Sequence, residues 1–122
     1  GITPSGMEFM ERDAIDWTLK FVDGISIQIK DEVQAHLLIE LDGNDLDVLT
    51  KEAEVISVLM IEHDCDDILF ADTEEQKQNL WKMRRRVGEA VKSNSVYKEE
   101  DTVVPRAELP KLLKGVKDIG KK

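Results

Sequence analysis

Cysteine, aromatic residues and long apolar runs are all scarce in this chain of 122 residues. The single cysteine, Cys65, has no partner for an internal disulfide, which fits a reducing compartment, so we expect a cytoplasmic protein. No apolar run approaches the ~20 residues that a membrane-spanning helix needs, and no signal-peptide pattern is present. No repeat of about 20–50 residues occurs, which excludes a solenoid.

Positive charge is also in short supply, because 17 lysines and arginines face 26 aspartates and glutamates. The resulting net charge of −9 repels phosphate groups, so nucleic acid and anionic membrane surfaces are not expected as partners. Hydrophobic residues make up 41% of the chain, which suits a packed core and argues against disorder. We therefore expect one domain over residues 1–122.

Apolar residues recur with two different spacings along the chain. Helical spacing predicts helices over 12–22, from a cap at Asn44 to about Glu62, over 74–92, and from Pro105 onward. Asp72 or Thr73 would cap the third helix, and Asn94 would end it in a left-handed conformation. Alternation or short apolar runs predict strands over 5–10, 25–29, 36–42, 68–71 and 96–104, with 36–42 central. Strands alternating with helices indicate an open sheet with helices packed on it.

The helix over 74–92 carries the most suggestive residues. Its apolar stripe places Arg84 at one shoulder, with Trp81 and Gly88 on the same flank. Glycine inside a helix costs about 1 kcal/mol relative to alanine, and it leaves room for a close approach beside Arg84. Arginine suits a carboxylate ligand because its planar fork donates two parallel hydrogen bonds. The alternative is a surface arginine, like its neighbours, in the half of a helix where cations are favoured.

Charged residues dominate the predicted strand that follows this helix. On a strand, Lys98 and Glu100 would face one way, and Glu99 and Asp101 the other. The alternative to a binding role is a solvated edge strand, whose charges would also prevent aggregation.

Several stretches, in order, are similar to a known family. They are SGMEFMERDAI (5–15), AHLLIELDG (35–43), LWKMR (80–84), and VYKEEDTVVPR (96–106) before an amphipathic helix. Together they resemble the C-terminal cap region of FAD-linked oxidases, the group of glycolate oxidases, D-lactate dehydrogenases and D-2-hydroxyglutarate dehydrogenases. The resemblance covers nearly the whole chain.

This resemblance implies an α+β fold with a ferredoxin-like, open, mainly antiparallel sheet that covers the substrate side of a flavin. The reaction it implies is oxidation of a D-2-hydroxy acid by hydride transfer to FAD. Arg84 matches the family's arginine against the substrate carboxylate. Gly88 stands where some relatives carry a hydroxyl residue. Glu99 stands where some carry a lysine, so Lys98 binds substrate only if the strand slips by one residue.

The resemblance also implies what these residues do not supply. FAD would be bound mainly by a separate N-terminal domain, and the family's metal ligands and base would lie beyond Lys122. We therefore expect an inert cap fragment with no cofactor, metal or catalytic residue of its own, able to self-associate. The residues expected to face the flavin domain are Trp81, Gly88, Asp101, Thr102, Pro105 and Arg106.

Other features have simpler interpretations. The segment from Glu62 to Asp67 combines acidic residues with histidine and cysteine, but its spacing matches no EF-hand or zinc pattern, so a solvated loop is expected. His36, at the start of a strand, is expected to be structural. A stand-alone acidic domain that binds a partner or a small regulatory ligand remains the alternative function, because fold does not fix function.

Overall fold

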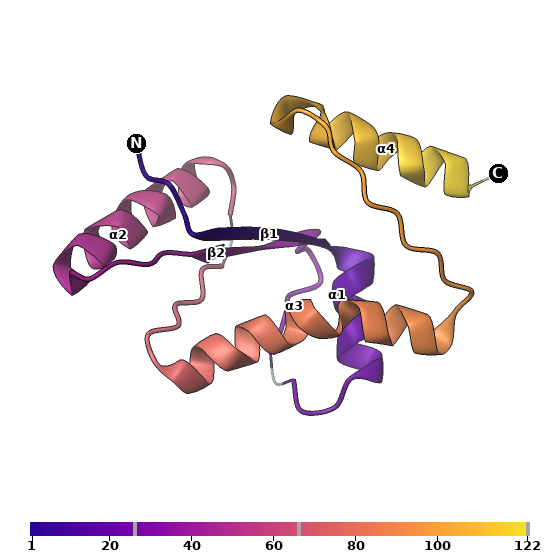
Figure 1. Ribbon diagram of the computed structural model, residues 1–122, viewed down its shortest axis with the longest axis horizontal. Helices are drawn as coiled ribbons and strands as arrows, with labels where there is room; N and C mark the ends of the chain where they lie inside the picture. The colour runs from indigo at the N-terminus through magenta and orange to yellow at the C-terminus, as the bar shows by residue number, and fades with distance from the viewer. Residues whose placement is uncertain (26, 66, 122) are drawn as a thin grey trace.

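A small antiparallel sheet and four helices make up the computed structural model, which describes residues 1–25, 27–65 and 67–121 (Figure 1). Strands β1 (Gly6–Glu11) and β2 (Ala35–Glu40) pair so that Glu8 lies opposite Leu38. The helices are α1 (Arg12–Phe21), α2 (Leu46–Glu62), α3 (Glu74–Asn94) and α4 (Leu109–Gly120), and the 3-10 turn η1 (Arg106–Glu108) precedes α4. The expected α+β class with an antiparallel sheet is confirmed.

Helices α1 and α3 pack against each other beneath one face of the sheet (Figure 1). The core between them is formed by Met10 from β1, Ile15 from α1 and Met83 from α3. Ile15 and Met83 are fully buried, and burying a side chain of this size stabilises the fold by about 1.5–3 kcal/mol. This packing fixes the rotation of α3 and therefore the direction in which its other side chains point.

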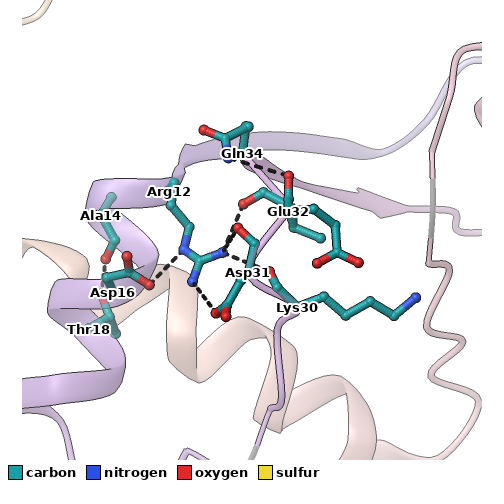
Figure 2. Close-up of polar contacts among 9 residues, drawn as sticks. Arg12, Ala14, Asp16, Thr18, Lys30, Asp31, Glu32 and Gln34 are labelled. Carbon is teal, nitrogen blue, oxygen red and sulfur yellow. Dashed lines mark hydrogen bonds and ion pairs between the residues drawn. The ribbon is translucent and has the colours of Figure 1, made fainter.

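The junction between β1 and α1 is held by Arg12 (Figure 2). Its Nη1 donates to the carbonyl oxygens of Lys30, Asp31 and Val33 at 2.7, 3.2 and 3.0 Å. Its Nε donates to Asp16 at 2.8 Å, one turn along α1. One guanidinium therefore ties the segment before β2 to the start of α1.

Three predicted strands are wrong. In the described residues of segments 25–29, 68–71 and 96–104 the structure has no strand; Ser26 lies outside the described residues. Ile25, Ile27 and Ile29 instead pack against the core as an irregular segment, so their alternation reflects burial and not sheet pairing. Val103 is almost fully exposed and has no neighbouring strand in the described chain.

The position of β2 and two helix ends also differ from expectation. Strand β2 was expected to be central, but in the described sheet it pairs with β1 alone. Asp45, not Asn44, caps α2, because the Asp45 carboxylate accepts hydrogen bonds from two backbone N–H groups. Asn94 is the last residue of α3, and Ser95, in an extended conformation, is its C-cap.

The face of the sheet opposite α1 and α3 exposes apolar side chains. Met7, Phe9 and Leu37 lie on that face by the strand register, and all three are exposed. Helix α4 lies on this side, at the end of an extended connection (Figure 1), and Lys117 of α4 pairs with Glu11 of β1 at 3.0 Å. An apolar surface of this kind is typical of a face that meets another part of a protein.

Candidate functional site

Helix α3, which carries the predicted arginine, is fixed by a capping box at its start and by buried side chains on its inner face. Thr73 and Gln76 form a capping box at its start, each side chain bonding the backbone of the other. Met83 and Ala90 are buried on its inner face, seven residues apart and therefore about two turns along the helix. Arg84 and Gly88 consequently lie on the flank of α3, as the apolar stripe predicted.

Arg84 reaches from α3 to the sheet. Its Nε donates to the Glu8 carboxylate of β1 at 2.8 Å. The side chains of Arg84 and Glu8 are 40% and 35% exposed, so the pair is open to solvent on one side. Within the described part of the chain, Nη1 and Nη2 of Arg84 make no hydrogen bond. The guanidinium is therefore held at Nε, and its two Nη groups remain available to another acceptor.

A shallow depression lies beside this guanidinium. It is lined mainly by residues of α3, among them Arg84, Gly88 and Lys92, and by Tyr97 and Glu99 of the following segment. A Cβ added at Gly88 would meet nothing within 4 Å, so the space next to Arg84 is open. The structure thus brings Arg84 and Gly88 to one surface, with a second cation, Lys92, one turn beyond Gly88.

The far wall of the depression is a small polar cluster. The Lys92 Nζ lies 4.9 Å from the centre of the Tyr97 ring and 3.4 Å from the Glu99 carboxylate. The hydrogen bond between Tyr97 and Glu99 raises the pKa of the phenol and lowers the pKa of the carboxyl, and Lys92 lowers the latter further. At neutral pH this wall therefore presents a protonated phenol and a carboxylate next to Lys92.

The remaining predicted site residues lie elsewhere. Lys98 is highly exposed and pairs with Glu100, and it does not line the depression. Asp101 and Thr102 are exposed in a segment without secondary structure, whereas Pro105 and Arg106 lie at the start of η1.

Trp81 is half-buried on α3, next to β1. Its Cη2 atom would lie 3.9 Å from a Cβ added at Gly6, and the Arg85 guanidinium lies 5.7 Å from its ring centre. Its indole therefore sits between the strand and a surface arginine and not in the depression.

Glu8, Lys92 and Tyr97 are site residues that the sequence prediction missed. A usable signal existed for Glu8. Alternation along β1 places Glu8 on the same face as Met10, a core residue, so a carboxylate there must face the helix layer. No comparable signal marks Tyr97, because its position depends on how the chain leaves α3.

Metal ligation finds little support in the geometry. Among the described residues, no group of three or more histidine, cysteine, aspartate and glutamate side chains could hold a metal ion, and Asp66 lies outside them. His36 is half-buried, which lowers the pKa of its imidazole, and its Nδ1 has no hydrogen-bond partner in the described chain.

Within residues 1–25, 27–65 and 67–121, no helix combines the length and the hydropathy of a membrane span.

Comparison with known proteins decides the family. The family described as FAD linked oxidases, C-terminal domain, matches residues 1–122. The chain belongs to this family. The order of the similar stretches along the chain had predicted the same assignment.

Proteins that are similar to this FAD-linked oxidase C-terminal domain are much longer than the chain. D-lactate dehydrogenase of Anaerostipes hadrus is 32% identical over 97% of the chain and 26% of its own length. Glycolate oxidase subunit GlcD of Bacillus subtilis is 29% identical over 99% of the chain and 25% of its own length. An uncharacterised FAD-linked oxidoreductase of Mycobacterium tuberculosis is 28% identical over 93% of the chain. The chain thus spans about a quarter of the length of these relatives.

The starts of α2 and α3 do not fit the pyrophosphate of FAD. A pyrophosphate is usually bound at a helix N-terminus by free backbone N–H groups. Here α2 begins at Asp45 and Asp47, and α3 begins with Glu74 and Glu75, so both ends repel phosphate. The depression beside Arg84 is lined by three cationic side chains, those of Arg84, Arg85 and Lys92, which suit a small anion.

Proposed function

We propose that residues 1–122 form one domain, the substrate-binding cap of an FAD-dependent 2-hydroxy-acid dehydrogenase or oxidase of the D-lactate or glycolate type. The flavin is held by an N-terminal FAD-binding domain outside these residues, and the cap alone is inactive and colourless. Free Cys65 fits a cytoplasmic enzyme. The family membership and the names of the similar proteins support the reaction class.

The observation that carries the proposal is the open guanidinium edge of Arg84. A 2-hydroxy acid is a small anion, and its carboxylate can accept two parallel hydrogen bonds from Nε and Nη2 or from the two Nη groups of an arginine. In this structure Glu8 occupies Nε, which leaves the Nη edge for the substrate. The adjacent empty volume at Gly88 gives the rest of the substrate room.

The chain therefore contributes binding and orientation in this proposal. FAD, when bound by its own domain, would accept the hydride. Arg84 fixes the carboxylate, and binding at a fixed point restricts how the neighbouring C–H bond can point. Lys98 remains part of the proposal as a second cation, which would have to leave Glu100 to reach the substrate.

The surface that meets the flavin domain is also part of the proposal. It comprises Trp81, Gly88, Asp101, Thr102, Pro105 and Arg106. Asp101 and Thr102 are exposed and lie on an irregular segment, which is the kind of chain that can order against a neighbouring domain. In the isolated chain, the exposed Met7, Phe9 and Leu37 would favour self-association, which analytical ultracentrifugation can measure.

Arg84→Ala in the complete flavoprotein is the test. Two hydrogen bonds to a charged group are worth about 1.5–3 kcal/mol each, so kcat/KM for D-lactate or glycolate should fall about a hundredfold or more. Arg86→Ala is the matched control, because Arg86 is on the same helix, pairs with Glu89 and does not line the depression beside Arg84. Unchanged kcat/KM in Arg84→Ala would refute the proposal and favour a regulatory ligand-binding domain.

A further inference from the structure

We propose that Glu8 is a positioning residue for Arg84, resting on the function proposed above. The inference starts from which nitrogen Glu8 binds. Its Oε2 accepts from Nε of Arg84 at 2.8 Å, and Nε is the guanidinium nitrogen bonded to the aliphatic part of the side chain. A carboxylate competing with substrate would be expected to occupy the Nη pair, whereas this one leaves that edge free.

The location of Glu8 makes it suited to this role. It lies on β1, in the middle of the strand pair, on the face that α1 and α3 cover. Its neighbours in the sheet on that face are Met10, which is part of the core, and Leu38, which is buried opposite it. A carboxylate on such a support moves little, unlike one on a loop.

Arg84 without Glu8 would have several rotamers to choose from. An arginine side chain has about 2 kcal/mol of rotamer entropy. The Arg84 side chain is 40% exposed, so solvent on its open side would not hold it in one rotamer. The Nε contact fixes the plane of the guanidinium before a substrate arrives. Substrate binding then does not have to overcome that loss of freedom.

The charge of the pair supports the same role. Glu8 compensates the positive charge of Arg84 only in part, because both groups are partly open to solvent, where screening weakens the pair. Arg84, Arg85 and Lys92 line the depression with Glu89 and Glu99. The depression thus keeps an excess of one positive charge over its lining carboxylates, and the Nη edge remains attractive to a substrate anion.

The experiment uses the complete holoprotein with D-lactate as substrate and a dye as electron acceptor. Glu8→Ala should raise KM about tenfold to a hundredfold and change kcat less, because a misplaced binding group loses affinity. Glu8→Gln, whose amide oxygen can still accept from Nε, should recover most of that loss. Glu40→Gln, on the same sheet face and without an ion pair in the described chain, is the control and should leave KM unchanged.

The double variant Glu8→Ala/Arg84→Ala separates positioning from general support of the fold. A residue that acts through Arg84 adds nothing once Arg84 is gone, so the double variant should match Arg84→Ala in KM; a structural residue would give an additive loss. A normal KM in Glu8→Ala, with a damaged Arg84→Ala, overturns the inference and leaves the proposed function standing. A lowered KM in Glu8→Ala overturns it by showing that Glu8 competes with substrate. No effect of Arg84→Ala overturns both.

Discussion

Replacing Arg12 by alanine tests whether a single side chain holds the segment before β2. The perturbation removes a part-buried hydrogen bond to the Val33 carbonyl and two exposed ones to Lys30 and Asp31. It also removes the exposed ion pairs with the carboxylates of Asp16 and Asp31. The part-buried bond is worth about 1.5 kcal/mol, and each exposed one about 0.5 kcal/mol.

The expected loss of stability follows from these contacts and one opposing term. The two ion pairs together add about 0.5 kcal/mol, which brings the total to about 3 kcal/mol. Freeing the arginine side chain returns about 2 kcal/mol of conformational entropy, because the guanidinium is held in one place in the folded protein. Arg12→Ala should therefore lower the free energy of unfolding by about 1 kcal/mol and the Tm by roughly 4 °C.

Urea unfolding followed by far-UV circular dichroism measures this difference. Arg12→Lys should recover little, because an ammonium group cannot reproduce the planar fork that reaches several carbonyls. Arg86→Ala, which loses only an exposed pair with Glu89, is the control and should stay within about 0.5 kcal/mol of the unaltered chain. An Arg12→Ala variant as stable as that control, or an Arg12→Lys variant as stable as the unaltered chain, would refute the reasoning.

Three further predictions concern the helix platform and the sheet. Thr73→Ala, which breaks the capping box with Gln76, should cost about 1 kcal/mol of unfolding free energy in the same urea assay, and no loss would show that the box is dispensable. Met83→Ala should cost about 2–5 kcal/mol by leaving a cavity in the core, whereas a loss below about 1 kcal/mol would mean that the core collapses around the site. Burial lowers the pKa of His36, so the folded state binds fewer protons than the unfolded state. The stability that neutral His36 contributes is present above pH 6.5 and is lost as the pH falls through the lowered pKa of the folded state. His36→Gln should therefore flatten the dependence of the unfolding free energy on pH in this range. An unchanged dependence would contradict the lowered pKa of His36.

Local signals predicted the helices well, and the structure shows why. The cap at Thr73 acts within a few residues of itself, so no distant contact is needed to read it. Pro105 likewise marks the start of helical backbone, although that backbone begins as the 3-10 turn η1 and α4 itself starts at Leu109. The flank position of Arg84 also followed from the apolar stripe alone. The strand β1 and its partner β2 were found because each combines apolar character with a clear end.

Strand pairing was less predictable, because a strand exists only with a partner. The isoleucines at 25, 27 and 29 alternate as a strand would, yet they pack against Met10, Ile15 and Met83, and the described residues of this segment form no strand. Periodicity reports which side chains are buried, and not whether a sheet edge is available to the backbone. Alternation along β1 could have placed Glu8 on the helix-facing side of the sheet, but it could not identify Arg84 as its partner, because Arg84 lies on a different element, α3, far along the chain.

The ion pair between Glu8 and Arg84 has a consequence for how this chain acquires its binding surface. The two residues are 76 positions apart, and closing a loop of that length costs about 4 kcal/mol of chain entropy. A helix such as α3 can form in about a microsecond from local contacts, but the pair needs β1 to reach the helix layer first. During refolding, helical content should therefore return before a positioned guanidinium does. A chain that has all its helices but an unpaired first strand would look folded by circular dichroism and would still lack the Glu8 contact that holds Arg84 in place.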